Sequence, residues 1–314
     1  MALIILLLLF FSEVYVAQSS GEERKGKDVR RAAVAGMFYP SSPTGLRSDI
    51  VKLLDTVPDV KAEGKIIAAL APHAGYVFSG RVAAFTHKIL SSAEFDTLVI
   101  IGHDTYSDAV AFTCPVDYYQ TPLGKVPVDR KMTTKMHKFN RGIKPHRSLH
   151  AREHTIEVHL PFLKVLDRRC KIIPILFGNP TPENCKVLSD AIQAAAGNKK
   201  VLVLASTDMS HYPRYELANK IDKSTLEVLR FMDVEKLFAH LAKHETASSV
   251  PNLRTAMCAK GGVGTAILFA KAQGADQLQI LHYANSGDVP AGDKDRVVGY
   301  CSALMVKTSA QAPK

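Results

Sequence analysis

Short apolar runs rich in β-branched residues alternate with longer amphipathic stretches between Lys65 and Val306. Runs of the first kind are typical of strands, and stretches of the second kind are typical of helices. The predicted strands are residues 66–71, 97–102, 171–177, 201–206, 279–285 and 297–306. The predicted helices are residues 80–90, 157–166, 182–196, 215–231, 234–243 and 264–273. This alternation predicts a single α/β domain in which helices flank a central sheet.

Three of the predicted strands end close to a histidine. His73 follows the strand 66–71, His103 follows 97–102, and His211 comes shortly after 201–206. A lone histidine after a strand is more often a hydrogen-bonded structural residue than a ligand. In α/β sheets, however, ligands collect where loops leave the carboxyl ends of strands. Three histidines in equivalent positions therefore indicate a site at that edge of the sheet.

Histidine suggests that this site holds a metal ion, because imidazole is the commonest transition-metal ligand near neutral pH. His73 and either His103 or Asp104 could supply two ligands. Cys258 is a candidate for the third, because it precedes a glycine-rich turn that opens an apolar helix. A helix dipole lowers the pKa of a thiol at its N-terminus and favours the thiolate. The alternative is that Cys258 is a small buried apolar residue, as most free cysteines are.

A second cluster of polar residues lies in the segment 152–161. If this segment begins a helix, His154 and Glu157 lie three residues apart on one face. That spacing fits an inward-facing acid/base pair, or a pair that supports the site, and it fits a solvated helix start equally well. The segment lacks the His-Glu-x-x-His order of zinc metalloproteases, so that class is rejected.

Other common catalytic motifs are absent from the sequence. It contains no Gly-x-Ser-x-Gly elbow, no Walker A loop and no Gly-x-Gly-x-x-Gly after a strand. Hydrolase, nucleotidase and dinucleotide-enzyme functions therefore lose their usual support. The glycine-rich turn at 261–264 could bind an anion through backbone amides, but close packing explains it better.

The first residues differ in pattern from the rest of the chain. An apolar run from Ala2 to Phe11 is followed by Ser12, Glu13 and small residues, which is typical of a signal peptide over residues 1–19. The run is too short for a permanent membrane span. We expect export to the periplasm or the exterior, a charged leader over 20–31, the folded domain over 32–308 and a disordered tail over 309–314.

Composition narrows the class of protein further. With 46% hydrophobic and 22% charged residues, the chain can bury a sizeable core. The net charge of +10 comes from scattered basic residues without a long basic block, so no specific nucleic-acid partner is expected. The five cysteines are odd in number and form no Cys-x-x-Cys pair, which excludes a complete disulfide framework and a zinc ribbon.

Several segments, taken together, resemble the Memo family, which includes the bacterial and archaeal proteins called AmmeMemoRadiSam system protein B. These segments are Ala-Gly-Met-Phe-Tyr-Pro at 35–40, Ala-Pro-His-Ala-Gly-Tyr at 71–76, Tyr-Gln-Thr-Pro-Leu-Gly at 119–124, Glu-His-Thr-Ile-Glu-Val-His-Leu-Pro at 153–161, Ser-Thr-Asp-Met-Ser-His-Tyr at 206–212, the turn at Cys258, and Tyr-Ala-Asn-Ser-Gly-Asp at 283–288. They follow the family's order over about residues 32–306.

The resemblance implies a fold like that of the class III extradiol (LigB-like) dioxygenases, which hold non-haem iron with two histidines and a glutamate. In Memo proteins a cysteine replaces the glutamate, so ring cleavage is not expected. Family members bind iron or copper, have been linked to redox chemistry, and include an animal signalling adaptor. Carried over by position, His73 and Cys258 match metal ligands, and Asp208 and His211 match residues that line the pocket.

This sequence departs from the family pattern at the second ligand. The family reads Gly-Pro-x-His, whereas Gly-His-Asp-Thr stands at 102–105. Counting from the Tyr-x-Thr-Pro-Leu landmark places the family histidine at Asp104 without a gap, and a one-residue adjustment favours His103. Ala259 also replaces the glycine that usually follows the cysteine.

The leading hypothesis is a metal-dependent protein of unknown substrate. Fe²⁺, or alternatively copper or zinc, would be held by His73, Cys258 and either His103 or Asp104. His211 would act as an acid or base with Asp208 orienting it, and His154 and Glu157 are further catalytic candidates. The rival hypothesis is a binding module that holds a small molecule or peptide in the same pocket without turnover. Oligomeric state is not readable from the sequence.

Overall fold

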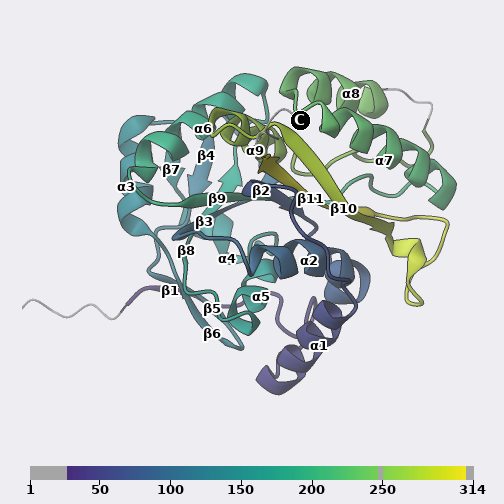
Figure 1. Ribbon diagram of the computed structural model, residues 1–314, viewed down its shortest axis with the longest axis horizontal. Helices are drawn as coiled ribbons and strands as arrows, with labels where there is room; N and C mark the ends of the chain where they lie inside the picture. Colours follow the sequence, from purple (N-terminus) through teal and green to yellow (C-terminus); the bar gives the residue numbers. More distant parts are fainter. Residues whose placement is uncertain (1–26, 247–249, 309–314) are drawn as a thin grey trace, which may run out of the picture.

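An eight-stranded mixed sheet forms the centre of the computed structural model, which describes residues 27–246 and 250–308 (Figure 1). Its strand order is β10 (Gln277–Asn285), β11 (Gly299–Lys307), β2 (Lys65–Ala71), β9 (Val201–Ser206), β3 (Thr97–Asp104), β8 (Lys171–Phe177), β4 (Ala111–Thr113) and β7 (Ile143–Pro145). The four strands from β2 to β8 are parallel, whereas β11 is antiparallel to β2 and β4 is antiparallel to β8. The predicted single α/β domain with a central sheet is confirmed.

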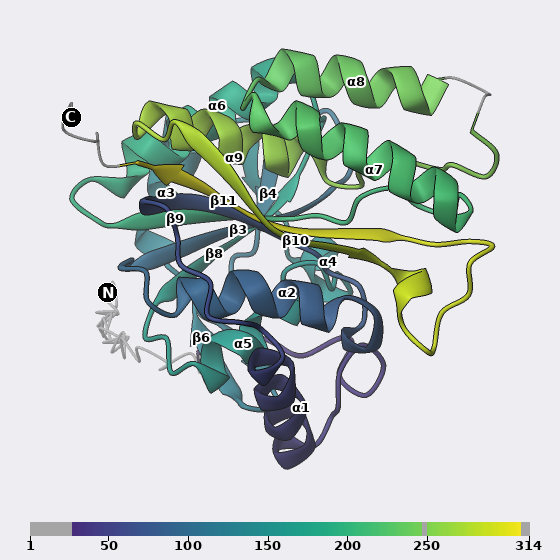
Figure 2. The ribbon, with the colours of Figure 1, turned by 45° about the vertical axis from the view of Figure 1, so that its right-hand side comes forward.

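Helices cover both faces of this sheet (Figure 2). One layer contains α3 (Arg130–Phe139), α6 (Pro182–Ala196), α7 (Tyr215–Arg230), α8 (Val234–Thr246) and α9 (Lys260–Ala272). The opposite layer contains α1 (Pro43–Asp55), α2 (Tyr76–Leu90) and α5 (Leu160–Val165). Both faces of β9 are therefore buried, which explains why its sequence is a continuous apolar run.

A small second sheet attaches the start of the described chain to the domain. It consists of β1 (Val29–Arg30), β5 (Tyr118–Thr121) and β6 (Gly124–Pro127). Arg30 is buried in this structure, so the predicted leader over 20–31 is wrong at its end: the folded domain begins inside it. The predicted signal peptide and tail lie outside the described residues and stay predictions. Within the described ranges, no helix is long and apolar enough to span a membrane.

Two helices begin earlier than predicted, because the glycines at which the predicted helices started lie inside the observed ones. Helix α2 begins at Tyr76 rather than at 80, and α9 begins at Lys260 rather than at 264. A Cβ atom on Gly261 would lie 2.4 Å from the ring of Phe177, and one on Gly264 would lie 2.7 Å from Sγ of Cys185. Because these two glycines lack side chains, α9 can pack closely against the sheet and α6. This agrees with the interpretation that the glycine-rich turn at 261–264 serves close packing.

Short elements account for most of the other differences. The predicted helix 157–166 is a 3-10 turn, η1 (Glu157–His159), followed by the short α5. The sequence patterns missed α1, α3, α4 (Arg147–Ala151) and the strands β4 to β7. Helix α1 had a recognisable start, because Ser42 accepts a hydrogen bond from the backbone of Gly45 and Pro43 occupies the first turn.

Candidate functional site

The carboxyl ends of three neighbouring strands meet at one edge of the sheet. Strand β9 lies between β2 and β3, and all three are parallel. His73 follows β2, Asp208 and His211 follow β9, and His103 and Asp104 end β3. The structure therefore brings together the strand ends that the sequence singled out.

Cys258 and His73 are in direct contact at this edge. The Sγ atom of Cys258 lies 3.3 Å from Nε2 of His73 and accepts a hydrogen bond from the backbone amide of Asp208, also at 3.3 Å. The carboxylate of Asp208 in turn accepts from the backbone amide of His73 at 2.8 Å. Residues separated by most of the sequence are thus locked into one compact arrangement.

The other cysteines have a different environment. All five are free, and Cys114, Cys170, Cys185 and Cys301 are buried, whereas Cys258 is partly exposed. The four buried thiols are therefore placed as packing residues, as most free cysteines are.

Burial shifts the pKa values of both partners of the contact in the direction that favours their neutral forms. It lowers the pKa of His73 to about 3, and the neighbouring His103 adds to this effect. Burial also raises the pKa of the Cys258 thiol, with Asp208 contributing in the same direction. The expectation that the start of α9 lowers the pKa of this thiol is therefore wrong for the metal-free protein. Loss of hydration outweighs a helix-dipole effect that is typically about 0.3–1 kcal/mol.

The geometry of this pair fits two ligands of one metal ion. Typical metal–sulfur and metal–nitrogen bonds of about 2.3 and 2.0 Å place tetrahedral ligand atoms roughly 3.5 Å apart, and the observed separation is 3.3 Å. A neutral imidazole and a thiol that loses its proton on binding suit iron, copper or zinc. Among the described residues, however, no three His, Cys, Asp or Glu side chains lie close enough together to hold an ion. The pair fits a metal, and a third protein ligand is not preassembled.

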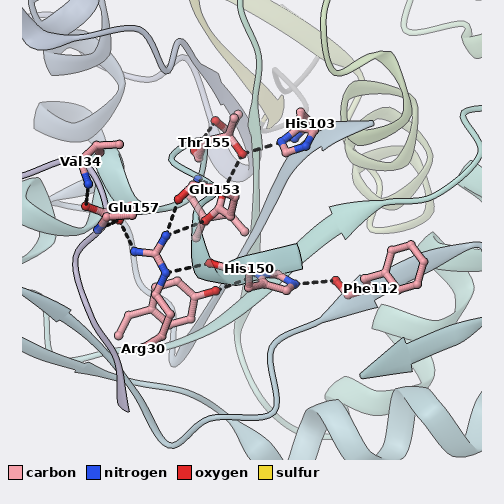
Figure 3. Close-up of polar contacts among 12 residues, drawn as sticks. Arg30, Val34, His103, Phe112, His150, Glu153, Thr155 and Glu157 are labelled. Atoms are coloured by element: carbon pink, nitrogen blue, oxygen red, sulfur yellow. Dashed lines mark hydrogen bonds and ion pairs between the residues drawn. The ribbon is translucent and has the colours of Figure 1, made fainter. Parts of the chain in front are cut away.

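The two candidates for the second ligand make different contacts. Both carboxylate oxygens of Asp104 face the backbone amide of Gly261 at the start of α9, at 3.2 and 3.4 Å. Burial raises the pKa of Asp104 to about 7. The backbone amide of His103 donates to Oγ1 of Thr155 at 3.4 Å (Figure 3), and burial lowers the pKa of its ring. His103 also lowers the pKa of His73. Both His103 and Asp104 therefore remain candidates for the second ligand.

The predicted partnership of Asp208 with His211 takes a different form. No hydrogen bond joins their side chains among the contacts of the described residues, because Asp208 is engaged by the backbone of His73. Its charge raises the pKa of His211, but burial, the larger effect, lowers that pKa overall. The Nε2 atom of His211 is buried and has no hydrogen-bond partner among the described residues. Its backbone amide is fixed by the carbonyl of Thr255.

His154 and Glu157 point into different surroundings, which corrects the expectation of a shared helical face. The residues before Glu157 form turns rather than a helix, so the three-residue spacing has no helical meaning. The ring of His154 lies edge-on to His73, with 5.7 Å between centroids, and against Phe38 at 4.6 Å.

Glu157 belongs instead to a separate buried group with Arg30 and Glu153 (Figure 3). These three residues and Tyr39, which also contacts Glu157, are called the ionic cluster. The Glu157 carboxylate binds the Arg30 guanidinium and accepts from the Tyr39 hydroxyl at 2.5 Å. It also accepts from the backbone amides of Ala33 and Val34. These contacts give Glu157 a role in anchoring the N-terminal segment of the domain.

Comparison with known proteins gives the same family over almost the whole domain. The family model described as "Memo-like protein" matches residues 30–304. The chain belongs to the Memo-like protein family. A MEMO1 family protein of Archaeoglobus fulgidus is 35% identical over 280 residues, which are 88% of this chain and 99% of the relative. A MEMO1 family protein of Thermococcus onnurineus is 34% identical over 302 residues, covering 89% of this chain and 100% of the relative.

This Memo-like chain also contains site residues that the sequence patterns missed. Ser206 lies behind His73, with its Oγ 2.9 Å from Nδ1 of His73 and 2.9 Å from Nε2 of His159. Nδ1 of His159 lies 3.0 Å from Nε2 of His87. We call His73, Ser206, His159 and His87 the histidine chain. His87 lies inside α2 and carries no local signal, so only the fold reveals its connection to the site.

Proposed function

We propose that His73 and Cys258 form a metal centre in this Memo-like protein, with His103 or Asp104 completing the ligand set. The observation that carries the proposal is the 3.3 Å separation between Nε2 of His73, at the end of β2, and Sγ of Cys258, in the turn before α9. Iron is the expected ion, with copper or zinc as alternatives. A bound iron or copper ion would supply redox or oxygen-dependent chemistry to an unknown substrate.

The surrounding residues have defined tasks in this proposal. Asp208 holds the pair in place, since its backbone amide donates to Cys258 and its carboxylate accepts from the backbone of His73. His211 presents a buried ring nitrogen, Nε2, that has no partner among the described residues and could exchange a proton with a ligand. A positioned histidine contributes about 10²–10⁴-fold as a general acid or base.

The decisive experiment compares Cys258→Ser with Cys301→Ser. Cys301 is a fully buried cysteine of β11, so its variant controls for the loss of a buried thiol. We expect Cys258→Ser to abolish stoichiometric iron in elemental analysis of the reconstituted protein. Cys301→Ser should keep iron at some cost in stability. If both variants keep full metal, or if both unfold and lose it equally, the assignment of Cys258 fails.

A second candidate function is ligand or peptide binding without turnover. It is favoured by a groove of about 620 Å³ lined by Phe38, Tyr76 and the exposed side chains of Met37 and Val77. The groove borders the site, because Phe38 contacts His154 and His154 contacts His73. Oxygen-consumption assays with iron-loaded protein separate the two functions. Oxygen uptake that Cys258→Ser abolishes supports an enzyme, whereas metal-independent binding of an apolar peptide without oxygen uptake supports a binding module.

A further inference from the structure

We infer that Ser206 fixes the tautomer of His73, so that Nε2 presents its lone pair toward Cys258 before any metal arrives. Three polar atoms surround the Ser206 hydroxyl oxygen: the carbonyl oxygen of Thr155 at 2.6 Å, Nδ1 of His73 at 2.9 Å and Nε2 of His159 at 2.9 Å. The inference deepens the proposed metal centre and rests on it for the consequence for metal affinity.

Counting protons determines the direction of each of these hydrogen bonds. A hydroxyl has one proton to donate and two lone pairs to accept with, and a carbonyl oxygen can only accept. At 2.6 Å the Thr155 carbonyl must therefore receive the single Ser206 proton, because the alternative places two lone pairs against each other. Both histidines must then donate to Ser206.

The consequence at His73 is a defined tautomer. The proton lies on Nδ1, and Nε2 carries the lone pair that faces Sγ of Cys258. Sγ of Cys258 lies 3.3 Å from this lone pair, and the backbone amide of Asp208 donates to the same sulfur. The nitrogen beside the thiol is thus the one free to bind an ion, and a ligating histidine usually donates its other N–H in this way.

The same count extends to the far end of the histidine chain. Because His159 donates through Nε2, its Nδ1 must accept, and His87 must donate through its own Nε2. That leaves Nδ1 of His87 as an acceptor, which is buried and has no partner among the described residues. The His87 ring stacks on Phe162 with 4.6 Å between centroids. Among the described residues, no hydrogen-bond donor to Nδ1 of His87 contradicts the hydrogen-bond directions assigned along the histidine chain.

The test measures the tautomer directly in metal-free full-length protein labelled with ¹⁵N-histidine. Long-range ¹H–¹⁵N NMR near pH 7 should show a proton on Nδ1 of His73. In Ser206→Ala, His73 loses its fixed acceptor, and a population with the proton on Nε2 should appear. Zn²⁺ affinity, measured by chelator competition, should fall about 10–100-fold, as is typical when a ligand loses its outer hydrogen bond.

Two variants separate this role from simple packing. Ser79→Ala removes another buried serine hydroxyl that donates to a backbone carbonyl, that of Ala74 at 2.9 Å, and should change neither the tautomer nor the affinity. Ser206→Thr keeps the hydroxyl and should retain the Nδ1 proton. A proton on Nε2 of His73 in the wild type overturns the inference, as does weaker Zn²⁺ binding in Ser206→Ala with an unchanged tautomer. If the wild type binds no Zn²⁺, the metal centre fails while the NMR spectrum still decides the tautomer.

Discussion

The ionic cluster and the histidine chain are two groups of buried polar side chains, and they differ in how those side chains are stabilised away from water. In the ionic cluster, the Arg30 guanidinium is paired with the Glu157 carboxylate and also donates to the carbonyls of His150 and Glu153. In the histidine chain, burial lowers the pKa of His73 and of His87 to about 3, so these rings are neutral. A buried charge requires a counter-charge, whereas neutral rings can be held by a single hydroxyl.

This difference explains why one region anchors the fold and the other can serve as a site. Glu157 accepts from four donors, which leaves its carboxylate little capacity for anything else. The histidine chain, by contrast, ends at Nε2 of His73 beside a partly exposed cysteine. A lone pair directed at a thiol is available to an ion, which the saturated carboxylate of Glu157 is not.

The largest effect is expected from breaking the ionic cluster. Arg30→Met should lower the free energy of unfolding by about 3–5 kcal/mol, because it leaves buried carboxylates without their counter-charge. Urea denaturation measures this change. Lys186→Met is the matched control, since it removes a cation from the exposed pair with Asp190 and should cost at most about 1 kcal/mol. Equal losses in the two variants would contradict the structural role of Arg30.

The next largest effect is expected beside His73, where two variants identify the second ligand of the proposed metal centre. His103→Ala and Asp104→Asn remove the two candidate metal ligands one at a time. The Asn side chain retains an oxygen that can accept the hydrogen bond from the backbone amide of Gly261. The variant that lacks the true ligand should lose more Zn²⁺ affinity than the about 10–100-fold typical of losing an outer hydrogen bond, and the other variant should change far less. If neither variant weakens binding, the end of β3 supplies no ligand.

A smaller effect is expected on the pH dependence of stability. The pKa of His87 in the folded protein is about 3, below the ordinary value of 6.5. The neutral ring therefore contributes fully to the free energy of unfolding above pH 6.5, and this contribution is lost as the pH falls toward 3. His87→Phe keeps the stacking on Phe162 and removes this dependence. Between about pH 6 and 4, the wild-type free energy of unfolding should fall relative to the variant by up to about 1.4 kcal/mol per unit. Parallel stability curves would show that His87 does not titrate this way.

The smallest effect on metal binding is expected at His211, which lies at the same strand ends outside the histidine chain. His211→Ala should leave Zn²⁺ affinity within about twofold while impairing any turnover, because a general acid or base contributes to the reaction rather than to the ion. Chelator competition beside His73→Ala measures the difference. A loss of affinity as large as that of His73→Ala would make His211 a ligand.

The outcome at particular residues shows where sequence reasoning succeeded and failed. His73 and Cys258 carried local signals, a strand end and a glycine-rich turn, and the structure places them in contact. Spacing misled at Glu157, because the assumed helix is a turn and its carboxylate faces Arg30. Arg30 looked like part of a solvated leader, since nothing in its own sequence neighbourhood shows that Glu157 neutralises it.

The sequence by itself determined the alternation of strands and helices, the single domain, the family and the strand ends that carry polar residues. Those properties depend on periodicity and short motifs, which are local. The tertiary structure decided which thiol meets which imidazole, that burial raises the pKa of the Cys258 thiol, and that the Ser206 hydroxyl contacts both His73 and His159. These properties depend on burial and on the directions of hydrogen bonds between distant segments, and both arise only when β2, β9 and the surrounding helices are packed together.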